Sequence, residues 1–424
     1  MLNLLKNTFK PQTPRPAFAR RLCRSCGENL QHSMIDLGMS PPSNRYLKPH
    51  QLTEMEPYFP LHAYVCHHCW LVQLEQFQAA DEIFAHDYAY FSSYSDSWLA
   101  HCERYATATT ERFKLNPSSL VIEVASNDGY LLQYFQQKKI PVLGIEPANS
   151  VAQAAMAKGI PTQIKFFGVK TARELKNKAD LLIGNNVLAH VPDLNDFVAG
   201  LAIALKNTGV ITIEFPHLLK LIEENQFDTI YHEHFCYFSL LAVQKVFARH
   251  GLDLFDVEEL PTHGGSLRIY GCHKGAQPIG PRIAALLSKE KAAGLDRLET
   301  YHAYRAKVER TKRALLQFLI KAKEEGKTIV GYGAAAKGNT LLNYCGIRQD
   351  FIDYTVDLNP HKQGQFLPGT HIPIYSRERI AETKPDYVLI LPWNIKDEVM
   401  RQMAHIRDWG AKFVVPIPEV KVLD

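Results

Sequence analysis

Two cysteine pairs with the same internal spacing lie near the start of the chain. They read C-R-S-C at residues 23–26 and C-H-H-C at residues 66–69, with residues 27–65 between them. Two C-x-x-C knuckles can supply four thiolates to one tetrahedral ion, whereas a redox-active dithiol needs only one pair. The sequence therefore predicts a closed, structural Zn²⁺ site in a small domain over residues 20–80, with Cys23, Cys26, Cys66 and Cys69 as ligands. A histidine ligand, His67 or His68, is the alternative.

The size and composition of the chain exclude several classes of protein. Its 424 residues predict more than one domain, and 46% apolar with 22% charged residues is typical of a globular chain. A net charge of only +4 provides no broad basic surface for nucleic acid, and no apolar run is long enough for a membrane span. The four remaining cysteines are scattered, which favours a reducing cytoplasm over a secreted disulfide framework. Residues 1–19 lack the apolar segment of a signal peptide and are expected to form a flexible tail.

After residue 80 the sequence alternates buried-strand patterns with helical ones. Strands are predicted at 120–124, 142–146, 180–184 and 210–214, with a helix at 129–137. A long charged helix over about 281–325 is expected to lead into a second series of strands, at 328–332, 387–391 and 413–416. Such alternation predicts parallel sheets. We therefore expect an α/β protein: a zinc-binding domain followed by two Rossmann-like doubly wound domains, over residues 81–280 and 281–424.

The segment VIEVASNDGYLL at residues 121–132 reads as a strand, a turn of small residues and the start of a helix. Small residues let the backbone approach a ligand, and the N–H groups at a helix start face it. Glu146 ends the next strand, where a doubly wound fold presents a carboxylate to ribose hydroxyls. The segment has one glycine, Gly129, and lacks the G-x-G-x-x-G of a dinucleotide loop. It predicts a nucleoside-containing cofactor, with an ordinary tight turn as the alternative.

Several strings in a fixed order carry a family resemblance. They are CRSCG, CHHCWLVQL, YAYFSSYS, VIEVASNDGYLL, GIEPA, NNVLAHVPDL, YHEHFCYFSL, THGGSLR, GYGAAAKGNTLLNY, VDLNPHKQGQFLPGTHIPI and LPWN. With them the chain resembles the sugar C-methyltransferases, which use S-adenosylmethionine to methylate C3 of nucleotide-linked 4-keto-deoxysugars. The resemblance extends from Cys23 to about Pro416. It implies a zinc domain, a central S-adenosylmethionine-binding domain and a C-terminal domain that helps to hold the sugar nucleotide, which we expect to be dTDP-linked.

Within this resemblance, the turn after residue 124 and the ends of the next strands are expected to bind S-adenosylmethionine. The expected residues are Glu123, Ala125, Ser126, Asn127, Asp128, Gly129, Leu131, Glu146, Pro147, Asn185, Asn186 and Val187.

Methylation of a ring carbon sets the requirements for the catalytic groups. The proton on C3 is acidic because a neighbouring ketone takes up the resulting charge, so a base near C3 and a donor near the C4 oxygen are needed. The segment Y-H-E-H-F at residues 231–235 offers both kinds of group, and no metal is needed. By resemblance His234 is the expected base, with His232 as the alternative. Glu233 would position or polarise the base, and Tyr231 would donate to the enolate oxygen.

Further residues are expected to complete the active site. His190 follows a predicted strand and supplies a second polar group, and the resemblance adds one of Tyr88 and Tyr90. The substrate is expected to contact two glycine-bearing turns and the strand end that follows the second. The expected residues are His232, His263, Gly264, Gly265, Arg268, Gly333, Lys337, Asn339, Asp357, Asn359, Lys362 and His371. Lys337 would place a positive charge beside a phosphate.

Two other functions stay open at this level. One is a nicotinamide-dependent nucleotide-sugar oxidoreductase, which the missing G-x-G-x-x-G disfavours. The other is a non-catalytic zinc protein that binds a nucleotide sugar, for which the Y-H-E-H-F segment would have little use. All three readings predict a small-molecule partner.

Overall fold

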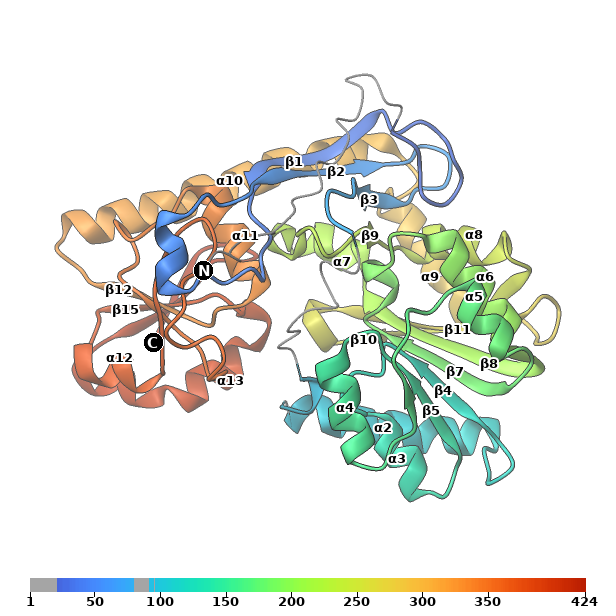
Figure 1. Ribbon diagram of the computed structural model, residues 1–424. Helices are drawn as coiled ribbons and strands as arrows, with labels where there is room; N and C mark the ends of the chain where they lie inside the picture. Colours follow the sequence, from blue (N-terminus) through green and yellow to red (C-terminus); the bar gives the residue numbers. More distant parts are fainter. Residues whose placement is uncertain (1–20, 80–90, 95) are drawn as a thin grey trace, which may run out of the picture.

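The computed structural model describes residues 21–79, 91–94 and 96–424 (Figure 1). Three sheets form its framework, one for each predicted domain. In Figure 1 the two α/β domains lie side by side. The N-terminal sheet and a long helix run along one edge of both domains. The α/β fold class with a small cysteine-containing N-terminal unit is confirmed.

The N-terminal sheet is antiparallel and has the order β1-β2-β3-β9. Its elements are β1 (His32–Ser40), η1 (Pro49–Thr53), β2 (Phe59–Val65), β3 (Val72–Leu74) and β9 (Cys236–Tyr237). The last strand comes from the middle of the chain and follows the Y-H-E-H-F segment directly. Val72 pairs with Tyr237, and the Leu74 N–H donates to the Phe235 carbonyl at 3.0 Å. The N-terminal unit is thus completed by residues more than 150 positions away in the sequence.

The central sheet has the order β10-β11-β8-β7-β4-β5-β6. Its strands are β4 (Val121–Val124), β5 (Val142–Ile145), β6 (Thr162–Gln163), β7 (Ala179–Asn185), β8 (Leu205–Pro216), β10 (Leu252–Leu260) and β11 (Ser266–His273). The helical segments between Ser92 and Gly264 are η2 (Ser92–Tyr94), α2 (Asp96–Phe113), α3 (Leu132–Gln137), α4 (Asn149–Ala157), α5 (Val169–Glu174), η3 (Leu188–His190), α6 (Leu194–Ala204), α7 (Leu218–Glu223), η4 (Phe227–Thr229), α8 (Leu240–Ala248) and η5 (Thr262–Gly264). Separate apolar clusters cover the two faces of this sheet.

The third sheet has the order β14-β13-β12-β15-β16-β17. Its strands are β12 (Ile329–Tyr332), β13 (Thr355–Val356), β14 (Ile374–Tyr375), β15 (Tyr387–Ile390), β16 (Lys412–Val415) and β17 (Lys421–Leu423). Its helical segments are α11 (Ala336–Cys345), α12 (Glu378–Thr383), η6 (Trp393–Ile395), α13 (Lys396–Gln402) and η7 (Ala404–Trp409). One apolar cluster joins this sheet to the N-terminal sheet through the long helix that precedes β12.

Two sequence expectations about these elements need correction. The sheets are mixed, because β11 runs antiparallel to β8 and β17 runs antiparallel to β16. The single charged helix is two helices, α9 (Pro281–Ala292) and α10 (Leu298–Glu324), because the chain turns at Gly294 with a φ of +83°. The turn lets α9 pack on the central domain while α10 runs along β1, with Trp70 stacked on Tyr301 at 6.2 Å.

The four predicted zinc ligands lie together at one end of the N-terminal sheet. Their sulfur atoms are all within 4.8 Å of one another, and none of the four forms a disulfide. A tetrahedral Zn²⁺ with Zn–S bonds of about 2.3 Å places its sulfurs about 3.8 Å apart, and two of the pairs here are separated by 3.5 Å. The cluster contains cysteines only, and His67 and His68 are exposed. The four cysteines therefore fit Zn²⁺ without a histidine ligand.

The zinc cluster is attached to the sheet by backbone and side-chain hydrogen bonds. Gln73 of β3 donates to the Cys23 sulfur at 3.2 Å and accepts from the Arg24 N–H at 2.8 Å. Such contacts orient metal ligands from outside the coordination sphere. Because Gln73 also pairs with Cys236 in the sheet, it links the metal site directly to strand β9.

We expect purified protein to contain about one zinc per chain, bound by the four cysteines. Cys66→Ser should lose the metal and unfold the N-terminal sheet, because the free energy of metal binding is folding free energy in such small units. Elemental analysis and limited proteolysis would measure both effects, with Cys345→Ala as the control for a buried cysteine outside the cluster. A metal-free wild-type chain with an intact N-terminal sheet would contradict this prediction.

A second stability prediction concerns Glu290, a fully buried carboxylate on α9. It accepts hydrogen bonds from the Leu240 and Leu241 N–H groups at the start of α8, and one oxygen lies 2.7 Å from His217 Nε2. Glu290→Ala leaves these three buried groups without a partner, at a cost of about 1–3 kcal/mol for each. We expect a large drop in the urea midpoint of unfolding, whereas Glu324→Ala on the exposed face of α10 should change it little. Equal midpoints for the two variants would show that this network contributes no stability.

Candidate functional site

The predicted cofactor turn lies at the carboxyl end of β4, in the middle of the central sheet. The chain passes from β4 to β5 and β6 on one side, then returns to β7 and β8 on the other. The order of the strands therefore reverses between β4 and β7, and ligands of doubly wound sheets bind in the crevice at such a point. Ala125, Asn127 and Gly129 all have φ between +49° and +76°, so this turn is tightly bent. The φ of Gly129 favours glycine, and a Cβ there would also press on Ile160 Cδ1.

Several buried polar atoms around this crevice have no hydrogen-bond partner among the described residues. They include the Ser126 hydroxyl, both amide atoms of Asn185, Oδ1 of Asp128 and Oδ1 of Asn186. Glu123 is fully buried, and burial raises the pKa of its carboxyl well above the usual range. Tyr130 lies beside it, but neither carboxylate oxygen of Glu123 accepts a hydrogen bond of normal geometry from a described residue. Buried polar groups are normally hydrogen-bonded, so such a concentration fits a site built for a polar ligand. The donor and acceptor set suits the amino acid and ribose groups of S-adenosylmethionine.

Glu146 lies at the end of β5, where the sequence predicted a ribose ligand. One oxygen accepts from the Asn127 N–H at 2.9 Å, and the other accepts from the Ala148 N–H at 2.7 Å. Burial raises the pKa of Glu146, although these two N–H groups oppose the shift. Glu146 therefore also holds the cofactor turn in shape.

The other predicted cofactor residues surround the same strand ends. Pro147 is half-buried after β5, and Val187 follows Asn186, whose amide nitrogen lies 3.2 Å from His263 Nε2. Leu131 differs, because its side chain is fully buried in the apolar cluster beneath the turn. A ligand at this turn could therefore contact only the backbone of Leu131.

The Y-H-E-H-F segment brings His234 next to His190 of η3. The two ring centroids are 4.7 Å apart, and the Tyr231 ring lies 4.0 Å from that of His234. His234 Nδ1 is 2.8 Å from the Thr229 carbonyl oxygen. Because a carbonyl can only accept, Nδ1 carries the proton and Nε2 keeps its lone pair. Burial holds the pKa of His234 well below its usual value and lowers that of His190 to about 4, so both rings are neutral near pH 7.

The neighbours of His234 in the sequence point into the contact with the N-terminal domain. His232 is buried with its ring edge-on to the stacked rings of Phe59 and Phe77, and its Nε2 lies 3.3 Å from the Pro60 carbonyl oxygen. Its ring therefore packs against the N-terminal domain and does not join His190 and His234. Glu233 also faces that domain, where the Asn44 amide donates to both of its carboxylate oxygens. Burial raises the pKa of Glu233 to about 7.

The C-terminal domain contributes Lys337 to the same region. Lys337 lies in the first turn of α11 and donates to Asn394 Oδ1 at 2.6 Å, with its ammonium 4.8 Å from the centre of the Trp393 ring. The Trp393 indole in turn donates to Asp228 of the central domain at 2.7 Å. Burial and the Lys337 charge together lower the pKa of His263 to about 4, and the Lys337 charge also lowers that of His234. These groups from two domains therefore share one electrostatic environment.

Residues of the first glycine turn differ in their surroundings. Gly264 and Gly265 have φ of +87° and +111°. A Cβ on Gly264 would lie 2.8 Å from Trp393, so this glycine lets the two α/β domains approach. Arg268 is buried in β11 and bonds to Glu214 at 2.7 Å and Glu258 at 3.0 Å. Its guanidinium is therefore engaged within the protein.

The second turn, after β12, is held by internal bonds. Asp357 accepts from the Ala334 N–H at 2.7 Å and the Asn359 N–H at 2.8 Å, and Lys362 donates to the Ala334 carbonyl at 2.9 Å. Gly333 has a φ of +91° beside Pro392.

Two more predicted substrate residues lie where the C-terminal domain meets the N-terminal one. Asn339 donates to the Ser43 carbonyl at 2.6 Å, and its own buried Oδ1 has no partner among the described residues. His371 forms an ion pair with Glu56 at 3.1 Å when protonated. Tyr88 and Tyr90 lie outside the described residues. Sequence reasoning gave no role to Asn44, Asp228 or Trp393, although Trp393 stands in the LPWN string.

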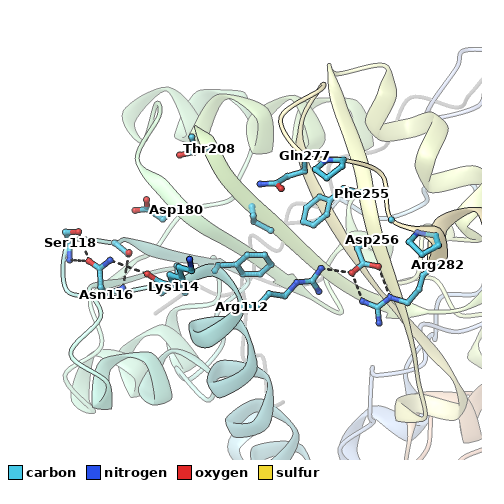
Figure 2. A pocket seen from close by; sticks show the side chains of 17 residues that line it. Arg112, Lys114, Asn116, Ser118, Asp180, Thr208, Phe255, Asp256, Gln277 and Arg282 are labelled. Atoms are coloured by element: carbon cyan, nitrogen blue, oxygen red, sulfur yellow. Dashed lines mark hydrogen bonds and ion pairs between the residues drawn. The ribbon is translucent and has the colours of Figure 1, made fainter.

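A cavity of about 790 Å³ lies at the opposite end of the central sheet (Figure 2). Asp180 at the start of β7 lines it, whereas Asn185 at the end of β7 lines the cofactor crevice. Arg112 and Arg282 reach its edge, and both donate to Asp256. None of its lining side chains carries a buried polar atom without a partner in the described part of the chain. Because this cavity lies at the other end of the sheet and its charged side chains are paired, we do not assign it to the reaction.

None of the helices in the described part of the chain combines the length and apolar character that a membrane crossing requires.

Comparisons with known proteins agree with this geometry. Three family models match in order: "Putative zinc binding domain" at residues 23–84, "Methyltransferase domain" at 98–257 and "C-methyltransferase C-terminal domain" at 261–418. The chain is 34% identical over 405 residues to C-methyltransferase NovU of Streptomyces niveus, which covers 95% of this chain and 96% of NovU.

The solved structures that resemble this chain include two that cover about two fifths of it. Magnesium protoporphyrin IX methyltransferase from Synechocystis is 14% identical, with a TM-score of 0.34, over 42% of this chain and 83% of its own. The YcgJ protein from Bacillus is 12% identical, with a TM-score of 0.34, over 40% of this chain and 98% of its own. Scores this low carry no weight beside the full-length match to NovU. That match and the three family models show that the chain belongs to the S-adenosylmethionine-dependent C-methyltransferase family, with a zinc-binding N-terminal domain.

Proposed function

We propose that this C-methyltransferase transfers a methyl group to C3 of a nucleotide-linked 4-keto-deoxysugar, expected to be dTDP-linked, with His234 as the base. The observation that carries the proposal is the hydrogen bond between His234 Nδ1 and the Thr229 carbonyl. It leaves Nε2 as a free acceptor on a neutral ring between the central and C-terminal domains. A base that is neutral at working pH can take up a proton without first losing one.

The first step requires a proton to leave C3. His234 Nε2 accepts it, and the electron pair of the C–H bond moves into an enolate whose charge lies on the C4 oxygen. Tyr231 lies against His234 and can donate a hydrogen bond to that oxygen. Lys337 adds a positive charge that acts on the same imidazole. Groups prearranged for a developing oxyanion contribute strongly to catalysis in a site that excludes water.

The second step requires a methyl group in line with C3. S-adenosylmethionine, when bound, supplies an electrophilic methyl group. Glu146, Asn185 and Ser126 would hold it, because they line the crevice at the ends of β4, β5 and β7 and offer buried acceptors and donors. The enolate carbon would form the new C–C bond as the methyl–sulfur bond breaks, with S-adenosylhomocysteine as the leaving group, and the proton on His234 would then pass to solvent.

The nucleotide is assigned to the C-terminal domain, over residues 281–424, with the S-adenosylmethionine domain over 81–280 and the zinc domain over 20–80. Asn339 supports this assignment because its buried Oδ1 has no partner among the described residues. Lys337 would serve a phosphate or the enolate oxygen, since it lies in the first turn of α11 and its charge acts on His234. His190 completes the polar lining near His234.

The acceptor can be tested directly with labelled S-adenosylmethionine and a panel of nucleotide-linked sugars. We expect label at C3 of 4-keto-deoxysugars only, since the ketone makes the C3 proton acidic. Equal transfer to sugars without the ketone, or label on oxygen, would overturn the proposal.

The cofactor assignment predicts separate binding effects. Glu146→Ala should weaken S-adenosylmethionine binding, because a hydrogen bond to a charged group is worth roughly 1.5–3 kcal/mol, or about tenfold to 150-fold in Kd. Binding of the sugar nucleotide should change little. Calorimetry with each ligand would measure both effects, and the reverse pattern would mean that the two ligand domains are exchanged.

The base assignment predicts a loss of proton abstraction in His234→Asn. Asparagine keeps a polar side chain but cannot act as a base near neutral pH, so turnover should fall about 10²–10⁴-fold. With S-adenosylhomocysteine bound, wild-type enzyme should exchange the C3 proton of a 4-keto sugar for solvent deuterium, and His234→Asn should not.

His232→Asn is the matched control, since His232 lies in the same segment but packs against Phe59. It should exchange at nearly the wild-type rate. Exchange by His234→Asn at the wild-type rate would remove His234 as the base. Glu233→Gln should reduce turnover less than His234→Asn if Glu233 only orients or polarises the base.

A further inference from the structure

One residue of the zinc-binding domain reaches the proposed catalytic segment. Asn44 lies in the loop between β1 and η1, and its Nδ2 is 2.8 Å and 3.0 Å from the two carboxylate oxygens of Glu233. Glu233 is only 9% exposed and precedes His234. The contact therefore joins the N-terminal domain to the residue next to the proposed base.

The surroundings of Glu233 make this contact electrostatically important. Burial opposes ionisation of the carboxylate, and the Asn44 amide is the group that favours its charged form. No lysine or arginine in the described part of the chain forms an ion pair with Glu233. A carboxylate without a cation depends on hydrogen-bond donors to remain charged in a buried site.

The titratable groups around this pair come from all three domains. Tyr46 lies on the Asn44 loop, with its hydroxyl 3.4 Å from Asn44 Oδ1. Lys362 and Asp357 of the C-terminal domain influence the pKa of Tyr46. Tyr46 therefore lies between these two residues and the Asn44–Glu233 pair. His190 hydrogen-bonds to the Glu233 backbone carbonyl, not to its carboxylate. The Asn44 amide is thus the direct partner of the charged atoms.

We propose that Asn44 is a positioning residue for methyl transfer: it fixes the carboxylate of Glu233, the residue next to His234, in its charged form, so that the zinc-binding domain completes the active site. The inference rests on the proposed function, in which His234 removes the C3 proton. A fixed negative charge near His234 favours the imidazolium that forms when the proton arrives. The zinc cluster and the β3–β9 pairing then serve catalysis indirectly, because they hold the domain that carries Asn44.

The alternative is that Asn44 is an ordinary contact between domains. Asn195 provides a matched control, because its amide also donates two hydrogen bonds across the boundary with the zinc-binding domain. They reach the Arg24 and Ser25 carbonyls at 2.9 Å and 3.1 Å. Asn195 does not contact Glu233, so it tests the effect of the domain contact alone.

The experiment is the pH dependence of kcat for wild type, Asn44→Leu, Asn44→Asp and Asn195→Leu, with zinc content as the check on folding. Because burial sets the pKa of Glu233 to about 7, wild-type kcat should fall below neutral pH as Glu233 becomes protonated. Glu233→Gln should lack this acid limb. The amide favours the charged form, so its removal raises the pKa, and Asn44→Leu should shift the limb to higher pH by about one to two units.

Asn44→Asp should shift the limb in the same direction, because two carboxylates at one site oppose ionisation. Asn195→Leu should leave the limb where it is in wild type. An unchanged limb in zinc-loaded Asn44→Leu and Asn44→Asp, or an equal shift in Asn195→Leu, would overturn the proposal.

The titration of Glu233 can also be followed without turnover. An infrared difference spectrum between each protein and its Glu233→Gln version isolates the Glu233 carboxyl band. If wild type methylates no 4-keto sugar, the proposed function fails, and the infrared midpoints still show whether Asn44 controls the charge of Glu233. If methylation proceeds and the midpoints of wild type and Asn44→Leu coincide, Asn44 has no such role.

Discussion

The pairing of β3 with β9 is the interaction on which the arrangement of this protein depends. Strand β9 leaves the central domain and completes the antiparallel sheet that carries the zinc ligands. A unit this small has only a small apolar core, so the metal and the borrowed strand both stabilise it. The same pairing fixes the chain immediately before β9. That stretch contains Tyr231, Glu233 and His234. Both the central domain and the N-terminal domain therefore hold this segment in place.

This anchoring explains how a short segment can present side chains in different directions. His232 and Glu233 face the N-terminal domain, whereas His234 lies against His190 in the central domain. The C-terminal domain closes the third side through Lys337 and the bond between Trp393 and Asp228. Burial by three domains keeps the imidazoles neutral, because a charged ring loses its solvation in such a site. The proposed acid–base chemistry thus depends on how the domains pack.

Two kinds of buried polar group mark the central domain. Glu290 and Arg268 have hydrogen-bond partners within the protein. Asn185 and Ser126 have buried polar atoms with no partner in the described residues. Since an unpartnered buried group costs free energy, natural chains keep such groups mainly where a ligand satisfies them. This contrast supports the proposed cofactor crevice better than cavity size does, because the cavity of about 790 Å³ lies at the other end of the sheet.

The sequence by itself determined the elements that depend on local patterns. The cysteine spacing predicted the cluster of Cys23 with its three partners, and the apolar runs predicted β4, β5, β7, β8, β12, β15 and β16 to within a few residues. The turn at Gly129 followed from small residues between a strand and a helix. These features need only the order of nearby residues, because their geometry is set by the backbone and by local hydrogen bonds.

Only the tertiary structure decided which distant residues meet. No local pattern distinguishes His232 from His234, and the difference between them arises because β9 pairs with β3. Asn44 looks like a loop residue in the sequence, yet it contacts Glu233 across 189 positions. The antiparallel direction of β11 and the break at Gly294 also escaped sequence reasoning. Pairing, domain contact and burial depend on the whole chain, and these determine the protonation states and the partners of the side chains that carry the chemistry.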